Sequence, residues 1–349
     1  MKKLREGFAT GSCAAAAALA CCMWIRDGKC PDAVEIIIPE GRCFHPEIIP
    51  HADGTCGVIK DAGDDPDITN GMEICANVRL LEANGAVRFC AGLGVGTITE
   101  AGLKLPVGEA AINPVPRKMI EKAVRSVFGE RGAEVTISIP GGETIARKTF
   151  NPRLGIRNGL SVLGTSGIVR PMSEDALKES LLAELKMRVC QGERDFIFTF
   201  GNQGEAALQR LYPEKRVIQV SNYLGFMLDS ALEMGVSSLL IGGHPGKMAK
   251  VAAGVMQTHS RTADARRETI VAHLAMMGAN GDILRSVYNC TTTDAAIALI
   301  HRAGLDDAWN QMALAAKYYC SLRVNGEIGI ETVFVDAQGN RIGESEATE

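Results

Sequence analysis

Three strand–loop–helix units of nearly even spacing constrain this chain more than any other feature of its sequence. The first begins with Phe196 to Phe200, an apolar run that is too short for a helix and too continuous for a half-exposed strand. The run ends at Gly201-Asn202-Gln203-Gly204, and a helix-compatible stretch follows. The same pattern recurs at residues 216–225 and at residues 237–246.

Repeated units of this kind predict a parallel sheet, because strand, helix and next strand are joined by right-handed crossovers. Such sheets bind ligands outside the carboxyl ends of their strands, where all three loops would lie. Small residues there let the backbone approach a ligand, and amide side chains can hydrogen-bond it. Glycines that serve only as turn residues are the alternative. The ligand-binding candidates at this edge are Gly201, Asn202, Gly204, Ser221, Asn222, Gly243 and His244.

The length of 349 residues suggests two domains. Residues 1–150 read as an α+β domain with two helices and with hairpins, among them 73–81 with 86–90 and 133–139 with 143–148. Residues 151–325 predict an α/β domain with a Rossmann-like, mostly parallel sheet. Residues 326–349 predict a terminal hairpin, which would be able to return to the sheet of the first domain.

Composition excludes several classes of function. The net charge of −4 and the absence of a Lys/Arg block give no reason to expect nucleic-acid binding. Eleven cysteines without a Cys-x-x-Cys pair favour reduced thiols in a cytoplasmic protein over disulfides or a metal site. No apolar run reaches the roughly 18 to 20 residues of a membrane span. A homo-oligomer is compatible with the sequence.

Two polar stretches near the N-terminus are candidates for binding. Ser12 is the expected N-cap of a helix that ends at Gly28, and with Thr10 it places hydroxyls at a helix N-terminus, where anions bind. Asp61, Asp64, Asp65 and Asp67 follow a predicted strand. A solvated turn with Asx caps, a cation loop and a ligand-binding role are all open for these four carboxylates.

Several blocks together resemble one family. They are Gly7 to Ala16, Ile59 to Asp67, Pro106 to Arg117, Asn151 to Ile156, Gly164 to Ser173, the Gly201 and Ser221 loops, and Thr258-His259-Ser260 with Ala263-Asp264. In these blocks the chain resembles the CbiD family, the cobalt-precorrin-5B C1-methyltransferases of anaerobic cobalamin biosynthesis. No single block carries the likeness, which extends over about residues 7 to 270.

The resemblance implies methyl transfer from S-adenosylmethionine to C1 of a corrinoid, with cobalt present only as part of the substrate. The sulfonium methyl is already activated, so the protein has to align the reacting atoms and exclude water. S-adenosylmethionine would bind at the three loops of the parallel sheet. The carboxylates of the macrocycle call for arginines and backbone N–H groups, although a solvated surface position is the alternative for each arginine.

Roles for individual residues follow from the same resemblance. The candidates for substrate binding are Thr10, Ser12, Asp61, Asp67, Arg117, Arg153, Thr165 and Arg170. Asp64, Asp65 and His259 are the catalytic candidates, and a cap or a core hydrogen bond is the alternative for the histidine. Two other classes stay open: a nicotinamide-dependent oxidoreductase, for which the Gly-x-Gly-x-x-Gly turn is missing, and a non-catalytic tetrapyrrole-binding protein.

Overall fold

The computed structural model describes residues 4–345 of the chain, which divides into two compact units, Met1–Ala176 and Leu177–Glu349. The division falls within helix α4 (Glu174–Cys190), later than the boundary expected near residue 150. Short strand pairs explain the difference. β11 (Ile168–Val169) pairs with β1 (Gly7–Phe8), and β10 (Ile156–Arg157) pairs with β8 (Thr97–Ile98). Residues 151–170 therefore belong to the first unit.

A five-stranded sheet forms the centre of the first unit, in the order β4-β5-β6-β9-β7. Its strands are β4 (Ile49–Pro50), β5 (Cys56–Ile59), β6 (Glu73–Asn84), β9 (Arg131–Ser138) and β7 (Val87–Ala91). A separate pair consists of β2 (Ile36–Ile37) and β3 (Cys43–Phe44). The short helices of this unit are α3 (Gly142–Ala146) and the 3-10 turn η1 (Asn151–Leu154).

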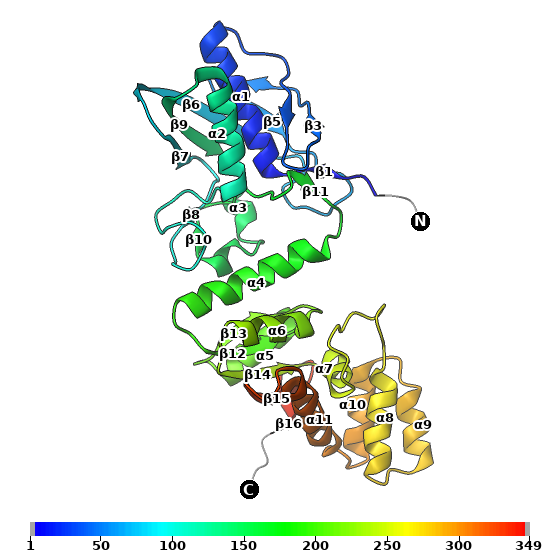
Figure 1. The fold of residues 1–349 in the computed structure, drawn as a ribbon. Coiled ribbons are helices and arrows are strands. Elements are labelled where there is room, and N and C mark those ends of the chain that lie inside the picture. The colour runs from blue at the N-terminus through cyan, green and yellow to red at the C-terminus, as the bar shows by residue number, and fades with distance from the viewer. Residues whose placement is uncertain (1–3, 346–349) are drawn as a thin grey trace. The chain divides into compact units, whose positions relative to one another are not determined.

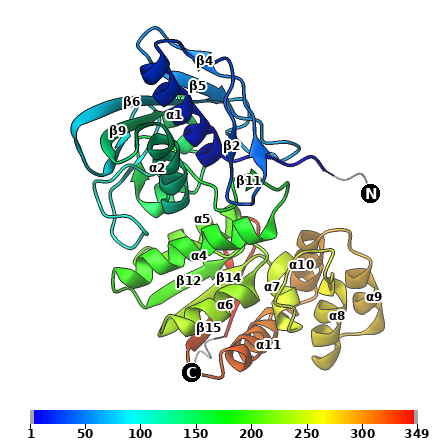
Figure 2. The same ribbon diagram turned by 45° about the horizontal axis from the view of Figure 1, so that its top comes forward.

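Two long helices, α1 (Thr10–Asp27) and α2 (Pro114–Phe128), lie side by side over this sheet (Figures 1 and 2). Ala14 to Ala18 are at most 1% exposed, and such small side chains let α1 approach its neighbours closely. The predicted end of α1 is confirmed: Gly28 has φ 72° and its N–H donates to the carbonyl of Trp24. The predicted N-cap is wrong, because the helix begins after Ala9 and Ser12 lies inside it.

The two predicted hairpins of the first unit are corrected. β6 and β7 do not pair with each other, because β9 lies between them, antiparallel to β6 and parallel to β7. In β9, the alternate residues Ala133, Val135 and Ile137 are fully buried, whereas β7 is more exposed. β9 is therefore better suited than β7 to a central position in the sheet. Residues 143–148 were expected to form a strand, but the chain forms the helix α3 at Gly142–Ala146 instead. β7, α2 and β9 thus make a β–α–β crossover.

The second unit contains a five-stranded mixed sheet in the order β13-β12-β14-β15-β16 (Figure 2). Its strands are β12 (Asp195–Thr199), β13 (Arg216–Gln219), β14 (Ser238–Gly243), β15 (Gly329–Val335) and β16 (Arg341–Glu344). The predicted parallel pairing is confirmed, because β12 runs parallel to both β13 and β14. The helices are α4, α5 (Asn202–Leu211), α6 (Leu224–Glu233), α7 (Pro245–Ala252), α8 (Arg266–Met276), α9 (Gly281–Tyr288), α10 (Thr293–Arg302) and α11 (Ala308–Arg323).

The C-terminal strands complete this sheet. β15 pairs in parallel with β14, and β16 pairs antiparallel with β15. The expectation that they return to the first domain is therefore wrong, because the apolar side chains of Val333, Phe334 and Val335 are buried beside β14 and its helices. Residues 346–349 of the expected hairpin lie outside the described residues. Among the residues described, no helix has the length and apolar character needed to cross a membrane.

Candidate functional site

The carboxyl edge of the parallel strands contains the point where the strand order reverses. From β12 the chain moves outward to β13 and then crosses back to β14 on the other side of β12. Thr199, the last residue of β12, lies level with Gln219 of β13 and Gly242 of β14. Open α/β sheets bind ligands in the crevice outside such a reversal. This edge is the candidate ligand site of the second unit.

Thr199 supplies an orphaned polar atom at this edge, which inspection of the sequence missed. The residue is fully buried, and its hydroxyl has no hydrogen-bond partner within residues 4–345. A Cβ added to Gly204 would lie 2.3 Å from that hydroxyl oxygen, whereas a Cβ added to Gly201 would meet no atom within 4 Å. At this edge Gly204 has no room for a side chain, whereas Gly201 does. The only sequence signal was a hydroxyl residue within the apolar run from Phe196 to Phe200.

The polar side chains of the first and third loops already have partners. The side-chain oxygen of Asn202 accepts a hydrogen bond of 2.8 Å from Gln219 of the neighbouring strand. Gly243 is the last residue of β14 rather than part of a loop, and His244 is the N-cap of α7. The Nδ1 atom of His244 accepts from the N–H of Gly246, and its Nε2 lies 3.0 Å from a carboxylate oxygen of Asp294.

The second loop leads into a cluster of cations. Ser221 has a left-handed backbone with φ 52°, and Asn222 accepts hydrogen bonds from Lys247 Nζ and, at 3.2 Å, from the Thr258 hydroxyl. The Nζ atom of Lys250 donates to the carbonyls of Thr258 (3.2 Å) and Ala263 (2.8 Å). The sequence reading missed both lysines, and their one signal was their three-residue spacing on an otherwise apolar helix.

The environment of these two lysines disfavours their charged forms. Burial lowers the pKa of Lys247 below the usual 10.5, and the charges of Lys250 and Arg266 lower it further. Burial also lowers the pKa of Lys250, although Asp264 acts against the shift. Asp264 itself forms an ion pair with Arg266. The cluster therefore holds three cationic side chains and one carboxylate.

His259 follows this cluster in the chain and lies in a turn. Its ring Nδ1 accepts a hydrogen bond of 3.1 Å from the N–H of Arg261, and its own N–H donates to the side chain of Gln257. The side chain is exposed. These bonds match the capping alternative, and it is the preceding Thr258 that contacts Asn222.

In the first unit, Thr10 and Ser12 hold the loop that precedes β11. The backbone N–H of Leu163 donates to the Thr10 hydroxyl at 2.9 Å, and the buried Ser12 hydroxyl donates to the carbonyl of Gly167 at 2.8 Å. The N–H of Gly11 is also taken, by the carbonyl of Leu163. The N-terminus of α1 is therefore occupied by its own loop. Thr165, at the tip of that loop, is exposed.

The four aspartates each have donors of their own. Asp61 pairs with Arg5, and Asp64 accepts from the backbone N–H of Arg5 at 2.7 Å. Asp65 accepts from the backbone N–H of Met172 at 2.8 Å. Asp67 lies 2.6 Å from the buried Nζ of Lys60 and also accepts from Thr69.

The fold thus brings several of the predicted substrate residues close to one another. The segment from Arg5 to Ala9 connects the aspartate loop, residues 61–67, to the loop that precedes β11. Arg5 pairs with Asp61, and the backbone N–H of Phe8 donates to the carbonyl of Asp61. The backbone N–H of Ala9 donates to the carbonyl of Gly167. We call these two connected loops the rim of the first unit. Arg170 belongs to this rim and forms ion pairs with Glu40 (2.5 Å) and Glu6 (3.4 Å).

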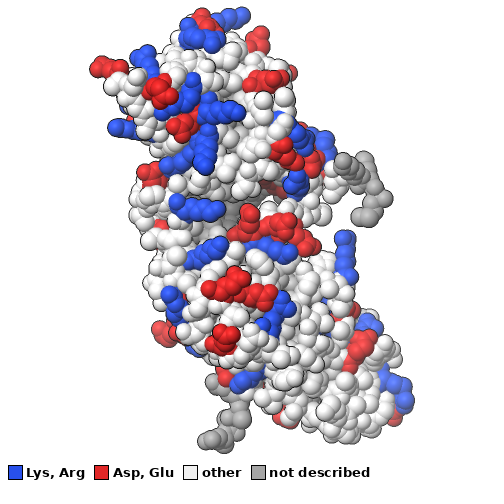
Figure 3. Space-filling view, viewed as in Figure 1, with Lys and Arg blue, Asp and Glu red and all other residues white. Residues whose placement is uncertain are grey.

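The remaining two arginines lie in other surroundings. Arg117 donates to the carbonyls of Ile112 and Ala110, pairs with Glu109 at 2.9 Å, and lies 5.0 Å from the centre of the Phe89 ring. Arg153 is half-buried in η1. On the face seen in Figure 3, basic side chains gather over α2, which carries Arg117, Lys118, Lys122 and Arg125.

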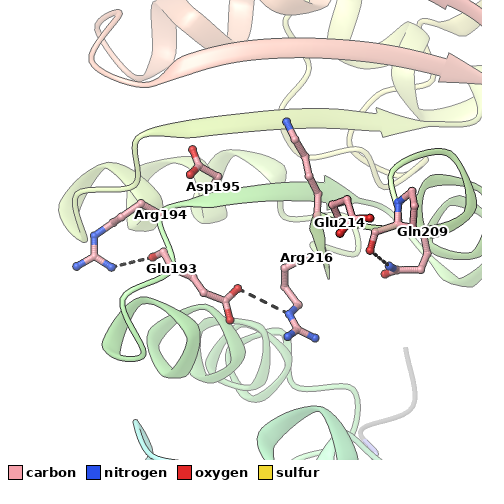
Figure 4. Close-up of a pocket in the computed structure, with 8 residues that line it drawn as sticks. Glu193, Arg194, Asp195, Gln209, Glu214 and Arg216 are labelled. Atoms are coloured by element: carbon pink, nitrogen blue, oxygen red, sulfur yellow. Dashed lines mark hydrogen bonds and ion pairs between the residues drawn. The ribbon is translucent and has the colours of Figure 1, made fainter.

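A hollow of about 460 Å³ lies at the opposite, amino-terminal edge of the parallel strands (Figure 4). Charged side chains line it, and Arg216 and Glu193 form an ion pair of 3.7 Å across part of it. Ligands of parallel sheets bind at the carboxyl ends of strands, so this hollow is not the candidate site.

One group of side chains has the composition of a metal site. His51, Glu73 and Cys75 place their ligand atoms within 4.8 Å of one another, and no other group of three meets that criterion in the part of the chain that is described. His51 Nε2 lies 2.7 Å from Glu73 Oε1, the distance of a hydrogen bond. Burial, together with Glu73, raises the pKa of the Cys75 thiol to about 12, so the sulfur is protonated at neutral pH.

Comparisons with known proteins agree along most of the chain. Residues 1–171 match the family model described as CbiD, and residues 257–346 match the model described as CbiD, C-terminal domain. A protein of Alkaliphilus metalliredigens, named cobalt-precorrin-5B C(1)-methyltransferase, is 43% identical over 340 residues, which is 95% of this chain and 90% of the relative. A protein of the same name from Desulfitobacterium hafniense is 41% identical over 97% of this chain and 89% of its own.

A solved structure is also similar. It is a cobalamin biosynthesis protein from Archaeoglobus fulgidus that is 26% identical, covers 75% of this chain and 84% of its own, and gives a TM-score of 0.41. The family models and the two relatives carry the assignment, because identity above 40% extends over nearly the whole length of each chain. The protein belongs to the CbiD family.

Proposed function

We propose that this protein is a cobalt-precorrin-5B C1-methyltransferase that uses S-adenosylmethionine and yields cobalt-precorrin-6A. Membership of the CbiD family and the names of its relatives support the reaction and the corrinoid substrate. S-adenosylmethionine supplies, when bound, a methyl group that its sulfonium already activates. The protein then has to hold the two reactants in line and keep water away, which are contributions of position rather than of covalent chemistry.

The observation that supports a donor site in the second unit is the orphaned hydroxyl of Thr199 at the strand-order reversal. A buried hydroxyl without a partner costs free energy, so it is expected to gain one when a ligand binds. A side chain at Gly201 would meet open space, Asn202 is the first residue of α5, and Asn222 lies two residues before α6. These features fit a polar nucleoside-type ligand on a Rossmann-like sheet.

For the corrinoid we propose the rim of the first unit that Asp61, Asp64, Asp65 and Arg170 form. Thr10 and Ser12 position its loop from behind, and Asp67 acts through Lys60. Among the described residues, Asp64 accepts a hydrogen bond from the backbone N–H of Arg5 and Asp65 accepts one from that of Met172. The other lone pairs of the two carboxylates are available to a proton of the substrate. His259, exposed in its turn, is the proposed alternative for proton transfer.

The test is an anaerobic incubation of the protein with cobalt-precorrin-5B and S-adenosylmethionine labelled in its methyl group. Label in the corrinoid product at C1, located by NMR, is the expected result. A corrinoid that binds without taking up label would favour a non-catalytic tetrapyrrole-binding protein. Binding of NADH, but not of S-adenosylhomocysteine, would favour an oxidoreductase instead.

A further inference from the structure

The contact between Asn222 and Lys247 crosses the end of the central strand. Asn222 follows β13 and Lys247 belongs to the helix that follows β14, whereas β12 lies between those two strands. Strands flanking a central one are about 10 Å apart. The hydrogen bond therefore spans the carboxyl end of β12, next to the strand-order reversal where the orphaned Thr199 hydroxyl lies.

Lys247 has donor capacity that the protein does not use fully. Its ammonium carries three N–H groups. They face the side-chain oxygen of Asn222 and, at a long 3.5 Å, the carbonyl of Thr258. No carboxylate of the described residues forms an ion pair with Lys247, although the other two cations of the cluster share Asp264.

The cluster is consequently short of negative charge. Lys250 is only 3% exposed, and Arg266 and Lys250 together have the single carboxylate of Asp264. A half-buried ammonium with unused donors, beside two further cations, provides strong binding for an anion, because a charge-assisted hydrogen bond strengthens where water is scarce. Lys247 lies in the first turn of α7, whose N-terminus also favours negative charge.

We infer that Lys247 binds a carboxylate group of a small-molecule ligand at the carboxyl edge of the second unit's sheet. Asn222 and Thr258 orient the ammonium, and Lys250 contributes charge from behind. This inference rests on the proposed function, which offers two sources of the carboxylate: the methionine part of the methyl donor, and the acetate and propionate groups of the corrinoid.

Equilibrium binding to purified Lys247→Met separates these sources. The probes are S-adenosylhomocysteine, 5′-methylthioadenosine, which lacks the amino-acid carboxylate, and cobyrinic acid, a corrinoid with free carboxylates. If the donor supplies the carboxylate, the variant should lose about tenfold or more in affinity for S-adenosylhomocysteine and keep its affinity for 5′-methylthioadenosine. If the corrinoid supplies it, only the affinity for cobyrinic acid should fall. Lys215→Met, an exposed lysine at the opposite edge of the sheet, is the matched control and should change neither.

Unchanged affinity of Lys247→Met for both S-adenosylhomocysteine and cobyrinic acid would overturn the inference, and loss of thermal stability alone would assign Lys247 a tethering role. If the unmodified protein does not bind S-adenosylhomocysteine, the proposed donor site fails, and the cobyrinic acid measurement alone decides the role of the lysine.

Should the Lys247→Met variant not fold, acylation of amines in the unmodified protein replaces the binding measurement on that variant. Either ligand at saturation should protect Lys247 from acylation, as read by peptide mass spectrometry, and reaction at the unliganded rate with both would contradict the inference.

Discussion

The Nζ atom of Lys60, whose side chain is 1% exposed, lies 2.6 Å from the Oδ2 atom of Asp67. A buried ammonium is tolerated only with a charged partner, because its loss of water is otherwise uncompensated. Asp67 therefore stabilises the fold of the aspartate loop, whereas Asp64, three residues earlier, is exposed and has no such role.

Replacing that partner should destabilise the first unit. Asp67→Asn removes the charge and leaves the Lys60 ammonium buried, which should lower the free energy of unfolding by about 3 kcal/mol. Urea unfolding followed by the fluorescence of Trp24 in α1, in a Trp309→Phe background, reports on this unit. Asp64→Asn is the control and should shift stability by no more than about 0.5 kcal/mol. Equal effects of the two substitutions would contradict the role of the pair.

The same pair predicts an acid dependence. Burial by itself would raise the pKa of the Asp67 carboxyl, but hydrogen bonds from Lys60 and Thr69 outweigh burial and hold that pKa below its ordinary 3.8. A carboxyl with a lowered folded-state pKa stabilises the fold above its unfolded pKa, and this contribution disappears as pH falls through the folded value. The difference in stability between the unmodified protein and Asp67→Asn should therefore be constant at neutral pH and shrink below about pH 4.

The carboxylates of Asp64 and Asp65 should matter for turnover rather than for stability. Each accepts a backbone hydrogen bond, from Arg5 and Met172, which an asparagine side-chain oxygen can also accept. Asp64→Asn and Asp65→Asn should lower the rate of methyl transfer by about tenfold or more, the range of general acid–base and electrostatic effects. Melting temperatures should stay near that of the unmodified protein. Full turnover in both variants would reduce this loop to a capped turn.

How much of this could be read from the sequence differs between elements. The three strand–helix units were predictable because their apolar runs and glycine-containing ends are local patterns. The position of β9 between β6 and β7 was not, because a strand's partners depend on which strands bury most apolar surface together. The Asn222–Lys247 contact was not predictable either. The two residues are 25 positions apart and belong to different strand–loop–helix repeats, so only the folded sheet brings them together.

Two glycines of the first loop should respond differently to the same substitution. A Cβ at Gly201 meets no atom within 4 Å, whereas one at Gly204 would approach the Thr199 hydroxyl oxygen to 2.3 Å. Gly201→Val should therefore leave the fold intact and weaken binding of S-adenosylhomocysteine, because its side chain fills the space left for the ligand. Gly204→Val should destabilise the second unit by about 1–3 kcal/mol through overpacking. Full affinity in a folded Gly201→Val variant would move the donor site elsewhere.

The cysteines should be dispensable for turnover. Cys43 and Cys190 are exposed, whereas burial raises the pKa of the Cys13 and Cys22 thiols to about 12 and leaves them unreactive. Under native conditions a thiol-blocking disulfide reagent should modify the exposed pair first and leave methyl transfer largely unchanged. Cys43→Ser/Cys190→Ser should lack that fast reaction. Stoichiometric zinc in the purified protein, lost together with activity in Cys75→Ser, would contradict this prediction and place a metal at His51, Glu73 and Cys75.

Carboxylate binding at Lys247 should depend on pH. Burial first, and then the charges of Lys250 and Arg266, lower the pKa of the free ammonium below 10.5, while Asp264 is the one carboxylate of the cluster. A bound carboxylate favours the protonated amine and so raises this pKa. Binding therefore takes up a proton wherever the free amine is neutral and the bound amine is charged.

The affinity for S-adenosylhomocysteine should consequently be constant below the lowered pKa of Lys247 and fall by up to about tenfold per pH unit as pH rises through it. The amino group of the ligand and Lys250, whose pKa burial also lowers, are both present in the Lys247→Met variant. The ratio of the two affinities, measured by calorimetry across the alkaline range, thus isolates the contribution of Lys247. The affinity of the unmodified protein divided by that of Lys247→Met should fall toward one as pH rises. A neutral amine has no charge, and it therefore loses its advantage over methionine in binding a carboxylate. A ratio above one that does not change with pH would mean that Lys247 acts without its charge.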